Sequence, residues 1–275
     1  MRKKILKIGI VGCGAIGSSL ARIIVRDLKA RAELTALFDI NINKLKLLAG
    51  KVSRSKNLET QNLAQLIGRC QLVIEAASAK SSWEIARKTI TEGRDIMVMS
   101  VGGIAPYFSK LHKLAGKHGT MIYIPSGAIA GIDALKAARV GRLRKVILRT
   151  IKNPASFKGV EYVKRKRLRL DGLKKDKILF SGSAASAIKY FPQNINVAAV
   201  LGLVGLGLDK TKVEIIASSR IKNNVHKIRI ESNAGTVETC TENVVHPDNP
   251  KTSYLAVLSA LAMLRQILEP VKIGT

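Results

Sequence analysis

The sequence predicts an α/β protein in which a doubly wound parallel sheet is followed by a smaller α+β domain with an antiparallel-rich sheet. Up to Pro125, short apolar runs alternate with longer amphipathic segments, which is the order of strands and helices in a parallel sheet. After Pro125 this alternation ends, and apolar runs separated by short polar turns follow one another. Such runs are typical of antiparallel strands.

The first domain is expected to contain five buried strands, each too short to be a helix. These strands are Lys7–Val11, Glu33–Phe38, Gln71–Ala76, Asp95–Met99 and Thr120–Ile124. Between them, apolar residues recur at intervals of three and four, which predicts amphipathic helices. These helices are Ser18–Lys29, Asn43–Ala49, Ser81–Glu92 and Tyr107–Lys117. The alternation predicts right-handed βαβ units.

The rest of the chain predicts a second domain and a terminal helix. The expected helices are Ile132–Arg139, Ser183–Tyr190, Ile195–Leu206 and Tyr254–Leu268. The expected strands are Lys145–Ile151, Thr211–Ala217, Asn224–Glu231 and Ala234–Thr239, with a polar turn, residues 218–223, joining the second strand to the third. We therefore expect three parts: residues 1–125, residues 126–248, and residues 249–275, whose helix packs back on the first domain.

Composition excludes several classes of protein. A hydrophobic fraction of 47% is too high for a disordered polybasic chain, and Lys and Arg interrupt every apolar run long enough to span a bilayer. The basic N-terminus lacks the apolar core of a secretory signal. The three cysteines, Cys13, Cys70 and Cys240, have no C-x-x-C spacing, which predicts a reducing cytoplasm and neither a disulfide framework nor a metal site.

The net charge of +28 raises the alternative of a nucleic-acid-binding protein. The charge is spread over both halves of the chain, and the densest window, Arg142–Lys177, contains 14 basic and three acidic residues. The run Lys164–Lys177 contains no aromatic residue. It therefore lacks the aromatic side chains on which the bases of single-stranded nucleic acids stack. We expect this window to be a solvated surface segment and expect no specific nucleic-acid partner.

A glycine motif follows the first strand. Gly12, Gly14 and Gly17 form G-x-G-x-x-G, with Ala15 and Ile16 between the last two. The first glycine permits a tight turn, the second lets a pyrophosphate approach the backbone, and the third lets helix and strand pack closely. Because the motif links a strand to an amphipathic helix, it predicts a Rossmann domain that binds a dinucleotide.

Asp39, at the end of the second strand, predicts NAD as the preferred cofactor. A carboxylate at this place accepts hydrogen bonds from ribose hydroxyls and repels a 2′-phosphate. The nearby Lys44 and Lys46 leave NADP open. Ala77 and Ser78 follow the third strand and are expected to contact the cofactor as well.

Of the four histidines, His226 is the candidate general base. The two-residue period of its strand places it on one face with Ile228 and Ile230, where desolvation favours a neutral imidazole. His112 and His118 belong to a Lys-rich surface helix, and His246 lies in a turn-rich loop. The competing interpretation of His226 is a structural histidine whose hydrogen bonds are satisfied.

A carboxamide-rich segment opens the helix that follows Phe191. Asn194 is expected to cap this helix or to bind substrate. Asn196 lies two residues further on and is harder to explain as a cap. Asn196 is therefore expected to bind a nicotinamide amide or the substrate.

Five segments, in this order and over nearly the whole chain, resemble the L-aspartate dehydrogenases. They are Gly12–Gly17, Ser126–Asp133, Phe191–Ala199, Asn224–His226 and Asn249–Tyr254. The resemblance implies NAD(P)-dependent oxidation of L-aspartate to iminoaspartate, which hydrolyses to oxaloacetate and ammonia, or the reverse amination, with iminoaspartate available for NAD biosynthesis. It also implies a homodimer, a catalytic role for His226, and cofactor contacts at Ala130 and Asn196.

Such a substrate carries two carboxylates, which need cations and N–H donors. Lys251, with Thr252 and Ser253 before the last helix, is the candidate for one of them, and plain helix capping is the competing interpretation. Another two-domain reductase, of the homoserine or dihydrodipicolinate type, is the alternative enzyme. The segments around Ser126, Asn194 and His226 favour the aspartate dehydrogenases.

Overall fold

The computed structural model describes residues 5–53, 57–191, 196–247 and 249–274, with the backbone alone for 249–251. The chain divides into two compact units: Met1–Pro125 with Val257–Lys272, and Ser126–Ala256 with Ile273–Thr275. Among the residues described, no helix is long and apolar enough to cross a membrane. The two units are taken in turn.

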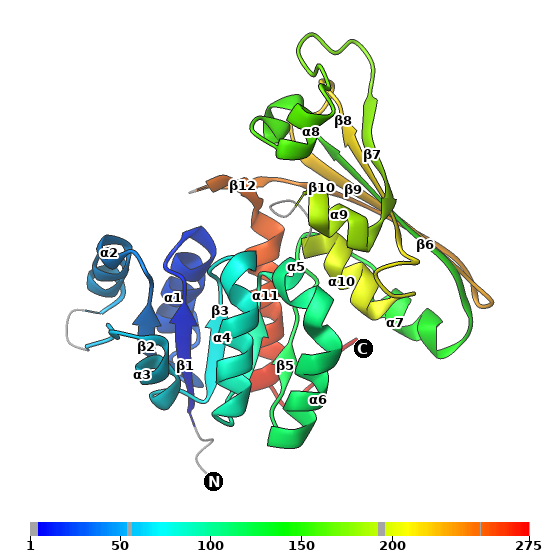
Figure 1. Ribbon diagram of the computed structural model, residues 1–275. Coiled ribbons are helices and arrows are strands. Elements are labelled where there is room, and N and C mark those ends of the chain that lie inside the picture. The colour runs from blue at the N-terminus through cyan, green and yellow to red at the C-terminus, as the bar shows by residue number, and fades with distance from the viewer. Residues whose placement is uncertain (1–4, 54–56, 192–195, 248, 275) are drawn as a thin grey trace. The chain divides into compact units, whose positions relative to one another are not determined.

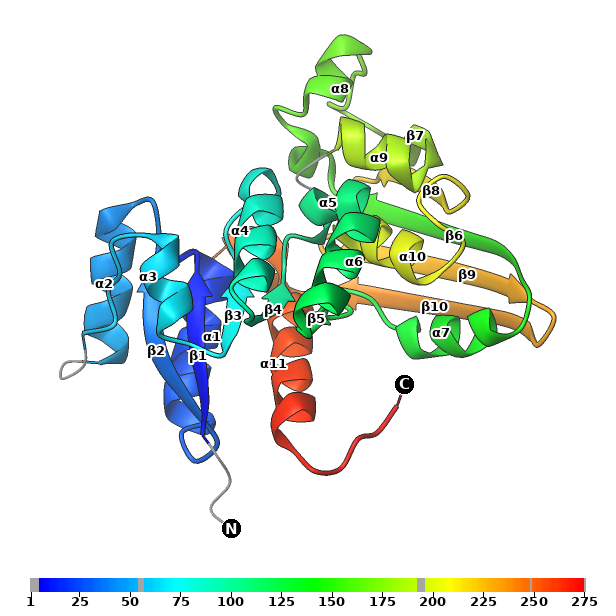
Figure 2. The same cartoon turned by 60° about the horizontal axis from the view of Figure 1, so that its bottom comes forward.

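The first unit is built on a five-stranded parallel sheet of order β2-β1-β3-β4-β5; Figure 1 labels β2, β1, β3 and β5, and Figure 2 labels β4 as well. Its strands are β1 Leu6–Val11, β2 Ala32–Phe38, β3 Leu72–Glu75, β4 Asp95–Val98 and β5 Ile122–Tyr123. Its helices are α1 Ala15–Asp27, α2 Ile42–Val52, α3 Leu63–Gly68, α4 Ala79–Thr91, α5 Val101–Ile104, η1 Ala105–Tyr107 and α6 Phe108–His118. The expected Rossmann architecture is confirmed.

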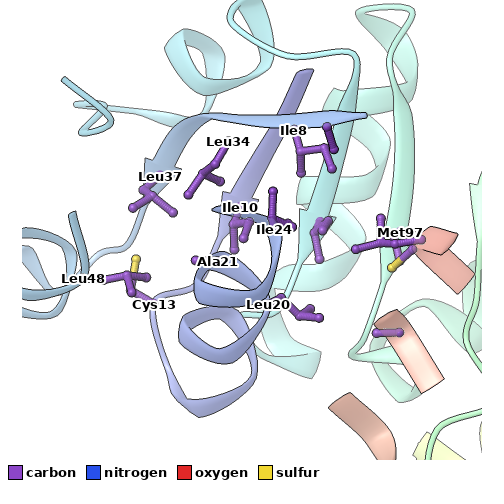
Figure 3. Packing of buried hydrophobic residues seen from close by; sticks show 14 of the residues in the cluster. Ile8, Ile10, Cys13, Leu20, Ala21, Ile24, Leu34, Leu37, Leu48 and Met97 are labelled. Atoms are coloured by element: carbon purple, nitrogen blue, oxygen red, sulfur yellow. The ribbon is translucent and has the colours of Figure 1, made fainter. Parts of the chain in front are cut away.

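Alternate side chains of each strand face opposite helix layers. Ile8 and Ile10 of β1 are fully buried and pack in one core with α1, with α2 and with the last helix, α11 Tyr254–Leu268 (Figure 3). Gly9, between them, faces the other way, because a Cβ there would lie 2.8 Å from Leu66 Cδ2 of α3. Val257, Ala260 and Leu264 of α11 belong to the same buried core as the α1 residues.

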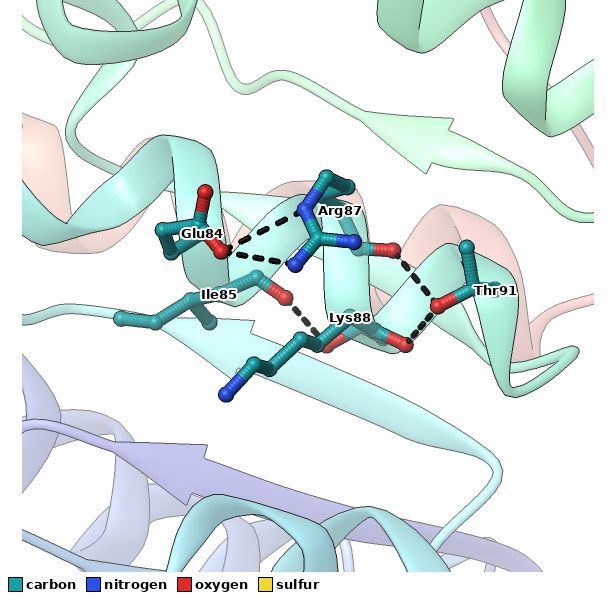
Figure 4. Close-up of polar contacts among 6 residues, drawn as sticks. Glu84, Ile85, Arg87, Lys88 and Thr91 are labelled. Atoms are coloured by element: carbon teal, nitrogen blue, oxygen red, sulfur yellow. Dashed lines mark hydrogen bonds and ion pairs between the residues drawn. The ribbon is translucent and has the colours of Figure 1, made fainter.

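Helix α4 illustrates how these helices are held. Its exposed side carries an ion pair from Arg87 Nη2 to Glu84 Oε2 at 2.9 Å and a hydrogen bond from Thr91 Oγ1 to the Arg87 carbonyl at 3.1 Å (Figure 4). Exposed pairs of this kind add little stability. Ile85 and Ile90 are buried on the opposite side, so burial of apolar surface holds the helix in place.

The second unit contains a five-stranded mixed sheet of order β10-β9-β6-β8-β7. Its strands are β6 Leu143–Lys152, β7 Lys177–Ser183, β8 Lys212–Ala217, β9 Asn224–Ser232 and β10 Gly235–Asn243. A short pair, β11 Val245–His246 and β12 Asn249–Ser253, precedes α11. The helices are α7 Ile132–Val140, η2 Pro154–Phe157, α8 Glu161–Arg165, α9 Ala184–Tyr190 and α10 Asn196–Val204. Residues of α7, α9 and α10 share one buried core with the sheet (Figure 2).

The polar turn joins β8 to β9 along the chain, as expected, and in the sheet β6 lies between these two strands and pairs parallel with β8. One expectation about the second unit was wrong. The basic window is not wholly a surface segment. It supplies β6 to the centre of the sheet, and it buries Lys152, Phe157 and Val163.

Candidate functional site

The glycine motif forms the turn from β1 into α1. Gly12 has a φ of +100°, and a Cβ there would lie 2.5 Å from the Ala76 carbonyl oxygen, so the turn requires glycine. A Cβ on Gly17 would lie 1.9 Å from the Gly12 carbonyl oxygen. Around Gly14, in contrast, no atom lies within 4 Å of such a Cβ, which leaves the backbone open to a ligand. Ala15 and Ile16 begin α1, whose free N–H groups suit a phosphate.

Asp39 is held directly beside this turn. Its Oδ2 accepts a hydrogen bond from the Cys13 N–H and its Oδ1 accepts one from the Asn41 N–H, both at 2.7 Å. The carboxylate is thereby fixed in orientation while further lone pairs stay free for ribose hydroxyls. Burial, and then the charge of Asp39, raise the pKa of the Cys13 thiol to about 12, so Cys13 is an inert packed residue.

Glu75, which the sequence analysis did not single out, organises the next turn. It is fully buried at the end of β3, and its two oxygens accept from the N–H groups of Ala77 and Ser100 at 2.9 Å each. Burial raises its pKa above the usual range of a carboxyl group. The backbone of the exposed Ala77, next to Ser78, is therefore held by a buried side chain that lies in an apolar run. A Glu in such a run is itself the signal that identifies it.

In the second unit, His226 lies on the buried face of β9. It is 4% exposed, and its Nδ1 lies 3.0 Å from the Thr150 hydroxyl, which belongs to its cross-strand partner in β6. Burial, and secondarily the positive charge of Lys152, lower the pKa of His226 to about 3. The expected desolvated position of His226, on the face of Ile228 and Ile230, is confirmed, and the lowered pKa favours the neutral imidazole.

The other three histidines differ in their exposure to solvent. His112 and His118 are exposed, as expected. His246 is not in an open loop: it is 3% exposed in β11, and its ring packs edge-on against Tyr254 with centroids 5.7 Å apart. Its side chain therefore has a packing role.

The segment around Ala130 is tied to β10 by side chains. Thr239 Oγ1 donates to the Ala130 carbonyl at 3.2 Å. Asn243 Nδ2 and Thr241 Oγ1 donate to the Ala128 carbonyl at 3.0 and 3.1 Å. Because Thr241 is the cross-strand neighbour of His226, β10 links the predicted cofactor segment to the strand of the candidate base.

The structure describes the remaining predicted site residues only in part. Asn194 lies outside the described residues, and Asn196 is the exposed first residue of α10. Lys251, Thr252 and Ser253 end β12 directly before α11, with Thr252 half-buried and Ser253 buried. The side chain of Lys251 is outside the description. The N–H of Tyr254, the first residue of α11, donates to the Val244 carbonyl at 2.9 Å.

In the five-stranded sheet of the second unit, the face opposite His226 carries a shallow groove of about 720 Å³, which residues of β6, β9 and β10 line. Arg229 is paired with both acidic residues of the groove: its Nε lies 2.8 Å from Glu231 Oε1, and its Nη1 contacts Glu238. The groove therefore differs in character from the buried face that carries His226.

Family models match both halves of the chain. The model described as the NAD-binding domain of homoserine dehydrogenase matches residues 12–125. The model described as the C-terminal domain of aspartate dehydrogenase matches residues 133–267. The first half thus agrees with a dinucleotide-binding domain shared by several reductases, and the second half separates aspartate dehydrogenases from the alternative reductases.

Full-length relatives agree with this division. The chain is 40% identical over 272 residues to the L-aspartate dehydrogenase of Methanosarcina barkeri and 42% identical to that of Methanosarcina acetivorans, covering 98% of this chain and 100% of each relative. Among solved structures, aspartate dehydrogenase from Thermotoga maritima is similar with a TM-score of 0.75 at 26% identity, covering 98% of this chain and 100% of that one. A homoserine dehydrogenase from Thiobacillus denitrificans shares the fold, with a TM-score of 0.62 at 14% identity, over 97% of this chain and 75% of that one. With a dinucleotide turn, a buried neutral histidine and relatives of this similarity, the chain belongs to the L-aspartate dehydrogenase family.

Proposed function

We propose that this chain oxidises L-aspartate to iminoaspartate with NAD or NADP, the imine then hydrolysing to oxaloacetate and ammonia, and that it also runs the reverse amination. The proposal depends on His226, whose side chain is 4% exposed and whose lowered pKa favours a neutral imidazole. The full-length relatives of the chain are named L-aspartate dehydrogenase. Iminoaspartate formed in this way is available for NAD biosynthesis.

The residues of the glycine turn fit a dinucleotide. Gly12, Gly14, Ala15, Ile16 and Gly17 would hold the pyrophosphate at the start of α1, where backbone N–H groups and the helix dipole favour negative charge. Asp39 would hold the ribose, and Ala77 with Ser78 would border the nicotinamide half. In the second unit, Ala130 and Asn196 are the proposed contacts. The bound cofactor supplies the hydride acceptor.

His226 takes part through proton transfer. Oxidation of an amine requires that its nitrogen lose a proton, and hydrolysis of the imine requires that a water be activated. A neutral imidazole can accept a proton in either step, which is worth about 10²–10⁴-fold in rate. The Thr150 hydroxyl, 3.0 Å from Nδ1, holds the ring so that the other nitrogen, Nε2, is the one available for transfer.

The substrate carboxylates need positive charge and N–H donors. We propose that Lys251, Thr252 and Ser253, directly before α11, bind one carboxylate, and that Asn194 contributes an amide. Lys251→Ala should mainly weaken L-aspartate binding and leave turnover at saturation nearly unchanged. An unchanged Michaelis constant for L-aspartate would make this segment purely structural.

One assay tests the proposed reaction directly. The protein is mixed with oxaloacetate, ammonium and either NADH or NADPH, and the absorbance of the reduced cofactor is followed. Activity with oxaloacetate that exceeds activity with other keto acids supports the proposal. Oxidation of L-homoserine in place of L-aspartate would support the alternative reductase instead.

We further propose a cytoplasmic homodimer. The absence of C-x-x-C spacing among Cys13, Cys70 and Cys240, all three free thiols, supports a reducing compartment. Light scattering after size exclusion, at low and high salt, should give twice the mass of one chain. A monomer mass at both salt concentrations would contradict the dimer.

A further inference from the structure

Glu75 lies where the strand order of the first sheet reverses. In the order β2-β1-β3-β4-β5, β2 lies on one side of β1, and β3 with the later strands lies on the other. A sheet of this kind binds its ligand in the crevice at the carboxyl ends of the two strands where the order reverses. Glu75 is the last residue of β3 and pairs in register with Val11, the last residue of β1. The crevice is therefore expected directly beyond these two residues.

The carboxyl group of Glu75 holds two loops at this edge of the sheet. One oxygen accepts from the N–H of Ala77, between β3 and α4, and the other from the N–H of Ser100, between β4 and α5, at 2.9 Å each. Burial raises the pKa of Glu75, whereas these hydrogen bonds favour the ionised form. A carboxylate has only acceptors, but an amide would turn its NH2 group toward one of the two N–H groups. The pair of hydrogen bonds therefore requires a carboxylate.

The segments that Glu75 joins also pack closely against their neighbours. A Cβ on Gly12 would lie 2.5 Å from the Ala76 carbonyl oxygen, so the loop after β3 lies directly against the glycine motif. A Cβ on Gly103 of α5 would lie 1.9 Å from the Ala79 carbonyl oxygen at the start of α4. The loops after β3 and β4 therefore belong to one closely packed edge next to the glycine motif, and Glu75 is hydrogen-bonded to both.

We propose that Glu75 is a positioning residue of the cofactor site, which fixes the two loops that border the nicotinamide half of the dinucleotide; this inference rests on the proposed function. The glycine motif and Asp39 would hold the adenosine and pyrophosphate half. Without both hydrogen bonds of Glu75, the loops populate the binding conformation less often. The apparent Kd rises in inverse proportion to that population, and it does so for ligands that contain nicotinamide.

Titration with NAD and with ADP-ribose separates this role from a purely structural one, because ADP-ribose lacks only the nicotinamide. The Kd of each ligand is measured by calorimetry for the wild type and for Glu75→Gln, which keeps the shape of the side chain and replaces one acceptor by an NH2 group. Glu75→Gln should weaken NAD binding about tenfold, within the range for loss of a hydrogen bond to a charged group, and should change the Kd of ADP-ribose less than about twofold.

Thr89→Val is the matched control. Thr89 is fully buried in α4 of the same unit, where its hydroxyl donates to the Ile85 carbonyl at 2.8 Å. The change removes a buried hydrogen bond near the other end of this helix and should leave both Kd values unchanged. Asp39→Ser should weaken both ligands alike, because both contain the adenosine ribose. Melting temperatures give the range in which every variant is folded.

Hydrogen exchange on the wild type tests the proposal even if Glu75→Gln does not fold. NAD should slow exchange in residues 76–78 and 99–103 more than ADP-ribose does, because these loops would border the nicotinamide. Equal protection by the two ligands would overturn the proposal, and so would an unchanged ratio of the two Kd values in folded Glu75→Gln. Wild type that binds NAD but fails to oxidise L-aspartate would contradict the proposed function instead, and the titrations would still decide the role of Glu75.

Discussion

His226 shows how a single buried residue links stability to pH. Its pKa is about 3 in the folded chain, against the ordinary value of 6.5 for a histidine in the unfolded chain, so between these values the unfolded chain binds the proton more readily. Stability contributed by the neutral ring is present above pH 6.5 and is lost as pH falls toward 3. The group therefore makes the protein sensitive to acid.

We predict that His226→Gln removes this sensitivity. Between pH 7 and pH 5, the unfolding free energy of the wild type should fall by about 2 kcal/mol more than that of the variant. This figure comes from about 1.36 kcal/mol for each pH unit between the pKa of 6.5 in the unfolded chain and the final pH. Urea denaturation at the two pH values measures the difference. Equal losses in both proteins would show that the ring is protonated in the folded state.

We propose that Asp39 determines cofactor choice through its carboxylate, which two N–H groups hold in place. We predict that Asp39→Ser raises the Michaelis constant for NAD at least about tenfold, as expected for a lost charge-assisted hydrogen bond, and changes that for NADP far less. The exposed Asp27→Ser on α1 is the control. An equal effect on both cofactors would remove Asp39 from ribose recognition.

Among the elements, the glycine motif between β1 and α1 contains two glycines that the backbone requires, Gly12 and Gly17, and one, Gly14, that we propose a ligand requires. We predict that Gly17→Ala destabilises the protein by at least about 1–3 kcal/mol, the usual cost of overpacking, because its Cβ would meet the Gly12 carbonyl. Gly14→Ala has open space around its Cβ and should keep the stability while weakening NAD binding. Chemical denaturation and NAD titration distinguish the two.

If Gly14→Ala binds NAD as tightly as the wild type, the pyrophosphate does not approach this turn. The two variants can be compared directly because each adds one methyl group within the same glycine motif.

Elements with strong local patterns were predictable, whereas strand neighbours were not. The strands β1 to β4 and the glycine turn follow from apolar runs and spacing, and His226 follows from the two-residue period of β9. The place of β6 between β8 and β9 depends on long-range pairing that no local pattern encodes. Strand β7, Lys177–Ser183, was missed because it begins within a Lys-rich run.

Lys152 was hidden for the same reason. It lies in the basic window, whose lysines are predicted to be exposed to solvent. Its burial follows from the position of β6 between β8 and β9 in the sheet. Glu75 carries a sequence signal, because it interrupts an apolar run, but that signal does not identify its partners, the N–H groups of Ala77 and Ser100, the second of which is 25 residues away. Both residues depend on tertiary contacts, which the spacing of residue types does not reveal.

At the scale of the whole molecule, the net charge of +28 predicts attraction to polyanions without a specific site. Retention on DNA should be independent of base sequence and should fall steeply with salt, becoming negligible by about 0.2 M. His226→Ala should be retained equally. Sequence-dependent binding that persists at that salt concentration would indicate a second role for the Arg142–Lys177 window.

The central claim is that His226 is the proton-transfer residue of an L-aspartate dehydrogenase. The most direct test compares kcat for L-aspartate oxidation in the wild type and His226→Ala, together with the Kd of NAD. We predict that kcat falls about 10²–10⁴-fold, the usual contribution of general-base catalysis, while the Kd of NAD changes less than about twofold. Turnover equal to that of the wild type would contradict the claim.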